Sequence, residues 1–268
     1  MSDLQHVSLG RGLAVLELLV RSDRPLSASE IGASIGVHQT TASRILADLI
    51  HIGYVRRVSY REFEPDYGLL ILGLNTAPHF PILDRPRLVL EHAARMCLGL
   101  QASLAMYWHR TLLYVDQAAR GTETRVFNGT DFPMHLSSPG LLFLMALPEP
   151  EAIAALHASR AKFGWAQPTA QVPPTESELL HAARRLHQNG IIVLSDWQET
   201  GHVSAAIRLP DVDGIPVAAA LSGPTDIMTI GTIRLRLQEI ARMLTPSLRS
   251  LGRHQNDSSS VVQTRRHG

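Results

Sequence analysis

The chain has 268 residues, enough for one large or two modest domains, and its 45% hydrophobic content is typical of a globular protein. No apolar run approaches the roughly 20 residues of a membrane span, and the single cysteine, Cys97, excludes an internal disulfide, so a cytoplasmic protein is expected. The formal net charge of +1 excludes nucleic-acid binding through overall charge, and any DNA affinity must come from basic side chains placed locally.

The first two predicted helices precede a tight turn. Residues 9–20 carry apolar side chains at helical spacing, which predicts a stripe buried along one face: Leu9, Leu13, Leu16 and Val20. A second helix begins at Ser27, because Ser27 and Glu30 have the spacing of a capping box, and it runs to about Ile35. Gly36 supplies the turn, since glycine tolerates a positive φ at a helix end.

A third helix and a basic hairpin follow this turn. The helix is predicted over residues 38–52, with an apolar inward face of Ala42, Ile45, Leu46 and Leu49. Its opposite face holds short polar groups around one arginine: Gln39, Thr40, Ser43, Arg44 and Ala47. Two extended runs near residues 54–59 and 62–69 have three arginines at or near their connection, Arg56, Arg57 and Arg61. This order predicts a winged helix-turn-helix over residues 1–68, in which the third helix reads the major groove and the hairpin follows phosphates.

The rest of the chain predicts a second, larger domain. Residues 69–79 are expected to form a short linker helix, residues 80–252 a domain of interleaved strands and helices, and residues 253–268 a disordered polar tail. Strands are predicted at 103–107, 112–117, 191–195, 203–209 and 216–221, and helices at 86–98, 138–147, 149–161, 175–188 and 225–251. With a hairpin turn at residues 211–214, this pattern predicts an α+β fold with a mainly antiparallel sheet.

Residues 9–73 resemble the N-terminal domain of the IclR family of regulators. The similarity lies in residues 10–17 (GRGLAVLE), 26–31 (LSASEI), 40–46 (TTASRIL) and 67–69 (YGL). The resemblance implies that residues 38–44 enter the major groove, that Arg44 lies at the DNA and that Arg11 approaches a phosphate. With the polar helix face and the hairpin, the candidate DNA-binding residues are Arg11, His38, Gln39, Thr40, Thr41, Ser43, Arg44, Arg56, Arg57 and Arg61.

The second domain resembles the effector-binding domain of the same family, which has a GAF-like sheet with a ligand cavity. The similarity lies in residues 132–140 (FPMHLSSPG), 190–193 (GIIV) with Gly201, 205–206 (AA), 213–218 (DGIPVA) and 222–224 (SGP). The resemblance points to Ser138, Pro139 and Gly140, whose backbone N–H groups are expected to attract a carboxylate or another electronegative group at a helix start. The other candidate effector-binding residues are Met106, His135, Ser195, Asp196, Ser204 and Ser222, with Trp108 and Trp197 as further walls.

The composition of these candidate positions limits the effector. No lysine or arginine is among them, which disfavours a multiply charged anion and favours a neutral to monoanionic organic molecule. The sequence departs from the family pattern around the cavity, with Ile191 in place of an aromatic residue, Trp197 in place of an acidic one and Pro139 in place of a small one. A ligand of another family member is therefore not carried over. For His135, a structural hydrogen bond is a stronger expectation than ligand contact.

No catalytic motif is found. The sequence has no nucleophile elbow, no phosphate-binding glycine loop, no Cys/His spacing for a metal and no implied cofactor, and Cys97 is expected to be a packing residue. Two alternatives to a ligand-responsive regulator stay open. One is a hydrolase-like enzyme with an appended winged helix, and the other is a winged-helix regulator without a small-molecule ligand.

The sequence therefore predicts a transcription regulator rather than an enzyme. A homodimer would present two recognition helices to pseudo-palindromic double-stranded operator DNA, because two-fold protein symmetry mirrors operator symmetry. The resemblance implies a dimer of dimers as a further assembly. The sequence does not decide between repression and activation, and it does not identify the effector or the operator.

Overall fold

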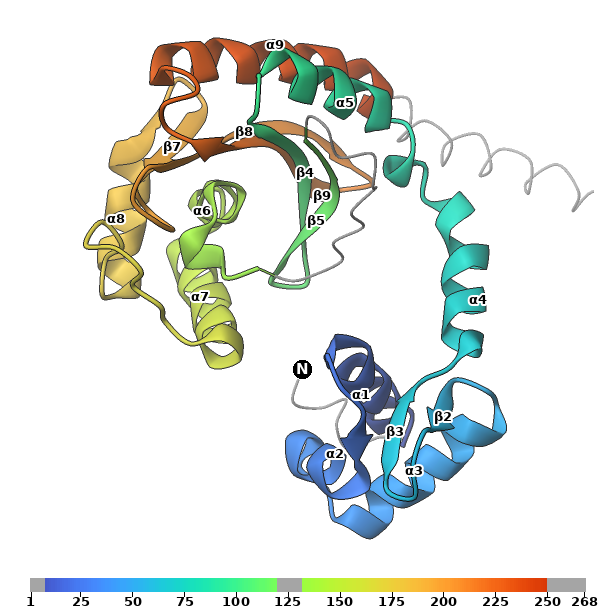
Figure 1. Ribbon diagram of the computed structural model, residues 1–268. Helices are drawn as coiled ribbons and strands as arrows, with labels where there is room; N and C mark the ends of the chain where they lie inside the picture. Colours follow the sequence, from blue (N-terminus) through green and yellow to red (C-terminus); the bar gives the residue numbers. More distant parts are fainter. Residues whose placement is uncertain (1–7, 120–131, 250–268) are drawn as a thin grey trace, which may run out of the picture. The chain divides into compact units, whose positions relative to one another are not determined.

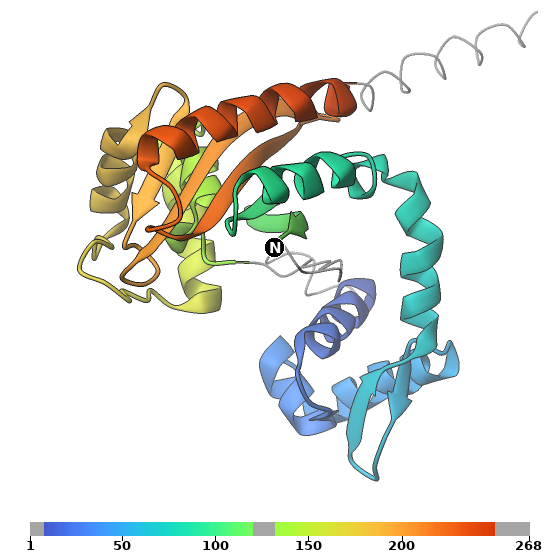
Figure 2. The same cartoon turned by 45° about the horizontal axis from the view of Figure 1, so that its top comes forward.

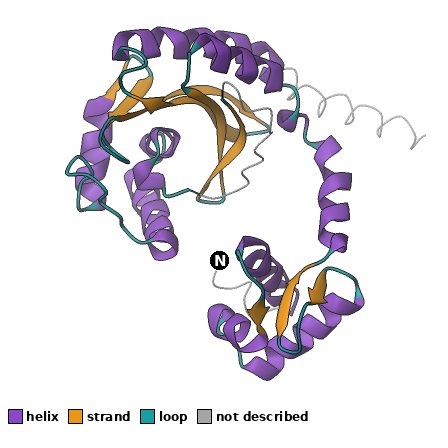
Figure 3. Cartoon of the chain, viewed as in Figure 1, coloured by secondary structure: helices purple, strands orange, loops and turns teal. Residues whose placement is uncertain are grey.

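A computed structural model describes residues 8–119 and 132–249 of the chain, which divides into two compact units, one ending at Phe80 and one beginning at Pro81 (Figure 1). The predicted tail at 253–268 and the end of the last predicted helix at Leu251 lie outside the described residues. The α+β fold class predicted from the sequence is confirmed: a helical domain with a small sheet is followed by a domain built on an antiparallel sheet (Figure 3).

The first unit contains the helices α1 (Ser8–Arg21), α2 (Ala28–Ile35), α3 (Gln39–His51) and α4 (Tyr67–Thr76). Its strands β1 (Leu26–Ser27), β2 (Val55–Arg57) and β3 (Glu62–Pro65) form an antiparallel sheet in the order β1-β3-β2. The second predicted extended run is shorter than expected, because Asp66 caps α4 by accepting the backbone N–H of Tyr67, and the linker helix begins there. The core lies between α1, α2, α3 and the sheet.

Only one residue of the predicted buried face of α1, Leu16, packs against the core, and it is partly buried. Val15 and Leu19 are the buried residues, whereas Leu9, Leu13 and Val20 are 73%, 53% and 61% exposed. The helix is apolar around most of its circumference, so helical spacing fits more than one stripe. Contact with α3 and β3 selects the stripe that is buried. The exposed stripe on α1 is thus a surface that the first unit does not cover.

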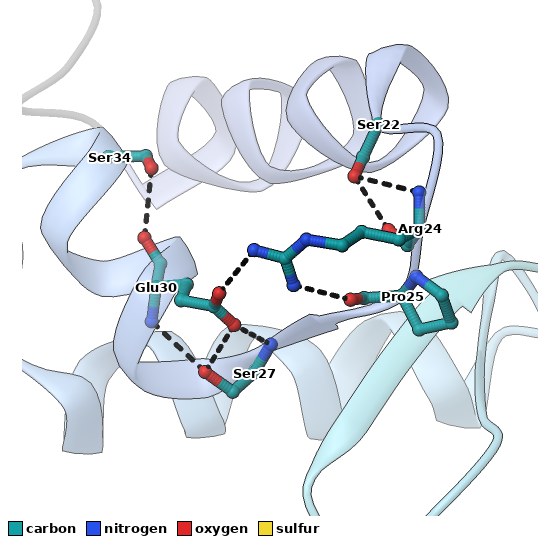
Figure 4. A network of polar contacts seen from close by, with 6 residues as sticks. All are labelled: Ser22, Arg24, Pro25, Ser27, Glu30 and Ser34. Carbon is teal, nitrogen blue, oxygen red and sulfur yellow. Dashed lines mark hydrogen bonds and ion pairs between the residues drawn. The ribbon is translucent and has the colours of Figure 1, made fainter.

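The start of α2 is the capping box predicted from Ser27 and Glu30 (Figure 4). The Ser27 hydroxyl accepts the backbone N–H of Glu30 at 3.3 Å, and the Glu30 carboxylate accepts the backbone N–H of Ser27 at 2.8 Å. The guanidinium of Arg24 adds an ion pair to the same carboxylate at 2.6 Å. At the other end, Gly36 has the left-handed conformation (φ 69°) expected for the turn into α3.

The second unit is built on a six-stranded antiparallel sheet in the order β5-β4-β9-β8-β7-β6. Its strands are β4 (Gln101–Trp108), β5 (Thr111–Ala118), β6 (His187–Gln188), β7 (Ile191–Ser195), β8 (His202–Val212) and β9 (Ile215–Pro224). The predicted turn before β9 is confirmed, since Asp213 and Gly214 both have positive φ between the paired residues Val212 and Ile215. The short hairpin of β6 and β7 around Asn189 was not predicted.

Helices cover both faces of this sheet. On one face lie α5 (Arg87–Met96) and α9 (Ile230–Arg249), which run along the strands in Figures 1 and 2. On the other, concave face lie α6 (Ser138–Met145), α7 (Glu149–Phe163) and α8 (Glu176–Leu186), with α6 directly against the sheet. The short 3-10 helices η2 (Ala77–His79) and η3 (Pro81–Leu83) precede α5, and η4 (Met134–Leu136) precedes α6. The sheet thus has two separate apolar cores, one on each side.

The capping network of α2 predicts a pH-dependent stability. Hydrogen bonds from Arg24 and from Ser27 hold the pKa of Glu30 at about 2, below the ordinary 4.5. A carboxyl whose pKa is lowered on folding stabilises the fold above its unfolded pKa and loses that contribution as the pH falls toward its folded pKa. The free-energy difference between the parent protein and Glu30→Gln, measured by urea unfolding, should therefore be largest at neutral pH and shrink from about pH 5 downward. With Arg24→Ala as the background the pH dependence should weaken, and a difference that stays constant with pH would contradict this assignment.

Candidate DNA-binding surface and sensor site

The third helix, α3, begins at an unusual cap. His38 is the N-cap residue, and its Nδ1 accepts the backbone N–H of Thr40 at 3.3 Å and lies 3.0 Å from the Thr40 hydroxyl oxygen. With Nδ1 as the acceptor, the ring N–H is on Nε2, where it is available as a hydrogen-bond donor. His38 is one of the DNA-binding residues predicted from the sequence, but its role as a cap was not predicted.

The polar face of α3 is exposed as predicted. Gln39, Thr40, Ser43 and Arg44 are exposed, Thr41 is half-buried, and Ala42, Leu46 and Leu49 are buried on the inward face. The turn before the helix depends on Gly32, which sequence reasoning missed, because a Cβ there would lie 2.9 Å from the carbonyl oxygen of Val37. The structure therefore brings short polar side chains and one arginine together on one side of a helix that is held firmly at its start.

The hairpin of β2 and β3 carries the three predicted arginines on exposed positions. Arg57 lies over the ring of Phe63 and Arg61 over that of Tyr60, with no carboxylate within ion-pair distance among the described residues. Arg56 differs, since its Nε donates to Glu64 at 2.7 Å. Its charge is therefore partly neutralised within the hairpin, and Arg57 and Arg61 are the stronger candidates for phosphate contacts. Arg11 is half-buried on α1.

The concave face of the sheet in the second unit holds a group of buried and half-buried hydroxyls. The Ser138 hydroxyl at the start of α6 is 2.6 Å from that of Ser204 on β8. The Tyr114 hydroxyl on β5 is 3.0 Å from that of Ser137, the N-cap of α6. Ser222 is the cross-strand partner of Ser204 and shares its face of the sheet. We refer to these residues, Tyr114, Ser137, Ser138, Ser204 and Ser222, as the sensor site. Tyr114 was missed, because strand register and not local sequence brings it here, whereas Ser137 belongs to the loop 136–140 that was expected to converge on the site.

The expected cluster of free backbone N–H groups at α6 is wrong. Pro139 has no N–H to offer, and the N–H of Gly140 is already donated to the Ser137 hydroxyl at 3.2 Å. Gly140 is instead needed for close packing, since a Cβ there would lie 2.7 Å from the carbonyl oxygen of Met134. The helix start thus supplies side-chain hydroxyls, chiefly that of Ser138, and not a backbone anion site.

Three other candidate positions lie away from the sensor site. Met106 packs in the core beneath α5 and α9, and Ser195 pairs with Val203, whose side chain lies in that same core. Both side chains therefore point to the opposite face of the sheet, as strand alternation requires. Asp196 has φ 55° and accepts the backbone N–H of Gly201 at 2.6 Å, so it closes a turn. The predicted effector role of these three residues does not fit their positions.

His135 has the structural contacts that were the stronger expectation. Its ring stacks on Trp165 at 4.4 Å, and its Nε2 lies 2.9 Å from the carbonyl oxygen of Ala166. Burial lowers its pKa, so the ring is neutral and donates this hydrogen bond from Nε2. Trp197 is buried and donates its indole N–H to the His135 carbonyl oxygen at 2.8 Å, while Trp108 is half exposed at a hairpin end. His135 and Trp197 therefore fasten the segment before α6.

No reactive centre is apparent in the part of the chain that the structure describes. Burial raises the pKa of the Cys97 thiol to about 11, which leaves the sulfur uncharged at neutral pH, in keeping with a packing role. Within residues 8–119 and 132–249, no three His, Cys, Asp or Glu side chains gather as metal ligands, and none of the helices could cross a membrane. A surface hollow on α8, lined by Glu178, His181, Arg184 and Arg185, contains none of the candidate residues.

Comparison with known proteins identifies the first unit and the fold. Residues 8–59 match the IclR helix-turn-helix domain, while no curated protein matches the chain. An IclR family transcriptional regulator from Brucella abortus is 22% identical, with a TM-score of 0.74 over 91% of each chain. A putative IclR transcriptional regulator from Silicibacter sp. TM1040 is 19% identical, with a TM-score of 0.74 over 92% of this chain and 96% of that one. An IclR homologue from Microbacterium hydrocarbonoxydans, complexed with 4-hydroxybenzoate, is 20% identical, with a TM-score of 0.68 over 91% of this chain and 100% of that one.

These findings confirm the resemblance to IclR regulators that the sequence indicates. Residues 8–59 match the helix-turn-helix domain of that family, and the structural matches show that the fold of IclR regulators extends over both units.

The contact between α6 and η4 predicts a matched pair of glycine variants. Gly140→Ala should destabilise the second unit by about 1–3 kcal/mol, because the added methyl must displace the Met134 backbone. Gly231→Ala is the control in the same unit, since Gly231 is helical and its nearest neighbour would be 4.0 Å from the new Cβ. Thermal unfolding of the full chain should show a lower melting temperature for Gly140→Ala only. Equal melting temperatures of the two variants would contradict this prediction, because the η4 backbone would then accommodate the added methyl group without cost.

Proposed function

We propose that this chain, an IclR-type transcription regulator by its helix-turn-helix domain and its fold, binds a pseudo-palindromic operator as a homodimer and responds to a small organic effector. The observation that carries the proposal is the exposed polar face of α3, with Arg44 among short side chains that leave room for base edges. Arg57 and Arg61 on the hairpin beside it supply positive charge for phosphates.

A second copy is the proposed partner because the first unit leaves a large apolar surface uncovered. On α4 no residue is buried and none is charged, and five large apolar side chains are at least half exposed: Tyr67, Leu70, Ile71, Leu72 and Leu74. The exposed stripe on α1 adds Leu9, Leu13 and Val20. Apolar surface of this extent marks an interface, and a two-fold axis between DNA-binding domains is what a palindromic site requires.

The sensor site is the proposed effector site. Its polar groups are hydroxyls, apolar residues of α6 and the sheet pack around them, and none of its members is a lysine or arginine. Such a site suits a neutral or monoanionic organic molecule that is held by apolar contact and a few hydrogen bonds. The homologue from Microbacterium hydrocarbonoxydans, which has the same fold, binds a molecule of this kind, 4-hydroxybenzoate. No observation favours the alternative of an enzyme with an appended winged helix.

Selection from a library of random-sequence DNA duplexes tests DNA binding. The parent protein should enrich duplexes with a two-fold inverted motif, and Arg44→Ala should weaken binding to the selected duplex by about 1–3 kcal/mol through loss of one groove or phosphate contact. Arg184→Ala, which removes an equal charge from an exposed ion pair on α8, is the control and should bind as the parent does. Failure to enrich any duplex, or unchanged affinity of Arg44→Ala, would contradict the proposed interface.

Substitution of α4 tests the dimer. Leu70→Glu should break self-association. Burial of a leucine stabilises an interface by roughly 1.5–3 kcal/mol, and in a two-fold dimer Leu70 of both copies would be buried. The mass of Leu70→Glu in analytical ultracentrifugation should approach that of a monomer, and binding to the selected duplex should weaken with it. Asn75→Glu adds the same charge at an exposed polar position of α4 and should leave the mass unchanged. If Leu70→Glu still sediments as a dimer, the interface does not depend on this face of α4.

A further inference from the structure

The edge strand β5 has one side chain, that of Tyr114, in the sensor site and another, that of Asp116, on the opposite face of the sheet. Tyr114 pairs with Ala105 on the α6 face, and simple alternation would place Asp116 on that face too. The register between β4 and β5 shifts at this point, however, so that Asp116 pairs with Leu104 and Val115 is an extra residue. This β-bulge turns Asp116 to the face of Leu104, toward α5.

There Asp116 meets Arg87, the first residue of α5. Arg87 Nη1 donates to Asp116 Oδ1 and to the Gln117 carbonyl oxygen, both at 2.9 Å, and its Nε donates to Glu91 at 2.7 Å. The Arg87 side chain is 15% exposed and that of Asp116 is fully buried. Arg87 directly follows the segment that connects α4 to the second unit, and η3 of that segment also packs against β5. The ion pair therefore joins the entry point of the linker to β5.

The Arg87–Asp116 ion pair is expected to contribute little to the stability of the fold. Asp116 Oδ2 is buried and has no hydrogen-bond partner in the part of the chain that the structure describes. A buried ion pair loses much of its Coulomb energy to desolvation, and an unpaired buried oxygen adds a further cost. Apolar residues of similar volume would serve packing at least as well. The pair does fix the position of α5 relative to β5, which an apolar contact would do less strictly.

We infer that the Arg87–Asp116 pair transmits the state of the sensor site along β5 to the linker, and so controls operator affinity. The inference rests on the proposed function and names its route of regulation. Among the described residues β5 is hydrogen-bonded to one neighbouring strand only, β4, so it can shift more easily than a central strand. An effector that replaces the contact between Tyr114 and Ser137 would move β5, and Asp116 would carry Arg87 and the start of α5 with it.

A double-mutant cycle on the full chain tests this coupling, with affinity for the selected duplex as the readout. Tyr114→Phe removes the hydroxyl contact in the sensor site and should change the operator Kd by roughly 2- to 30-fold, the range for residues that modulate coupling between sites. In the background Arg87→Met with Asp116→Leu, the same change should alter Kd less than about 2-fold, because the connection is gone. The melting temperature of this background should equal or exceed that of the parent.

A matched control and a substitute variant separate transmission from a structural effect. The exposed pair Arg184 and Glu149, 3.0 Å apart, is replaced in the same way by Met and Leu, and Tyr114→Phe should keep its full effect there. If the double replacement of Arg87 and Asp116 does not fold, Asp116→Asn takes its place, since it keeps the volume and removes the charge.

An equal effect of Tyr114→Phe with and without the ion pair, or no effect in the parent protein, would overturn the inference. The proposed function fails in a different way, by the absence of any duplex that the parent protein enriches.

Discussion

The second unit depends on the close approach of α6 to the concave face of the sheet. Every residue of α6 from Ser138 to Leu144 is buried, and its close approach is favoured by small side chains on the facing side of β4, β8 and β9. These are Ser103, Ala105, Ser204, Ala206, Ala218 and Ala220. Larger residues there would push the helix away from the sheet. The same small residues leave the hydroxyls of Ser138 and Ser204 in direct contact, so packing and the polar content of the sensor site have one cause.

The first unit shows a second constraint, which is incomplete burial. Its core is closed by α1, α2, α3 and the small sheet, yet α4 buries none of its residues and one stripe of α1 faces outward. Exposed leucine, isoleucine and tyrosine on one element after another are not explained by the fold of a single chain. A second copy would cover them and would also place two recognition helices for a two-fold operator. One interface thus accounts for both the apolar surface and the symmetry of the proposed DNA site.

Local chemistry was predictable from the sequence, whereas the choice of faces was not. The capping box at Ser27, the left-handed Gly36 and the polar side of α3 depend on residues a few positions apart, and the structure has all three. The buried stripe of α1 failed because its sequence allows more than one apolar face. The predicted effector role of Met106 and Ser195 does not fit the structure. The face on which a strand residue lies depends on the strand register, which no short motif specifies. The bulge at Val115 is the extreme case, since it reverses the alternation within one strand.

The polar groups of the sensor site satisfy one another in this structure, and this bears on how an effector could act. Tyr114 bonds Ser137 and Ser138 bonds Ser204, so a ligand must replace these contacts or use the remaining capacity of each hydroxyl. A ligand shifts an equilibrium only through different affinities for two states. If it replaces the Tyr114 contact, its binding energy becomes linked to the position of β5, whereas a ligand held by apolar contact alone would leave β5 in place. At the Tyr114–Ser137 pair, therefore, one interaction could both select the effector and control the linker.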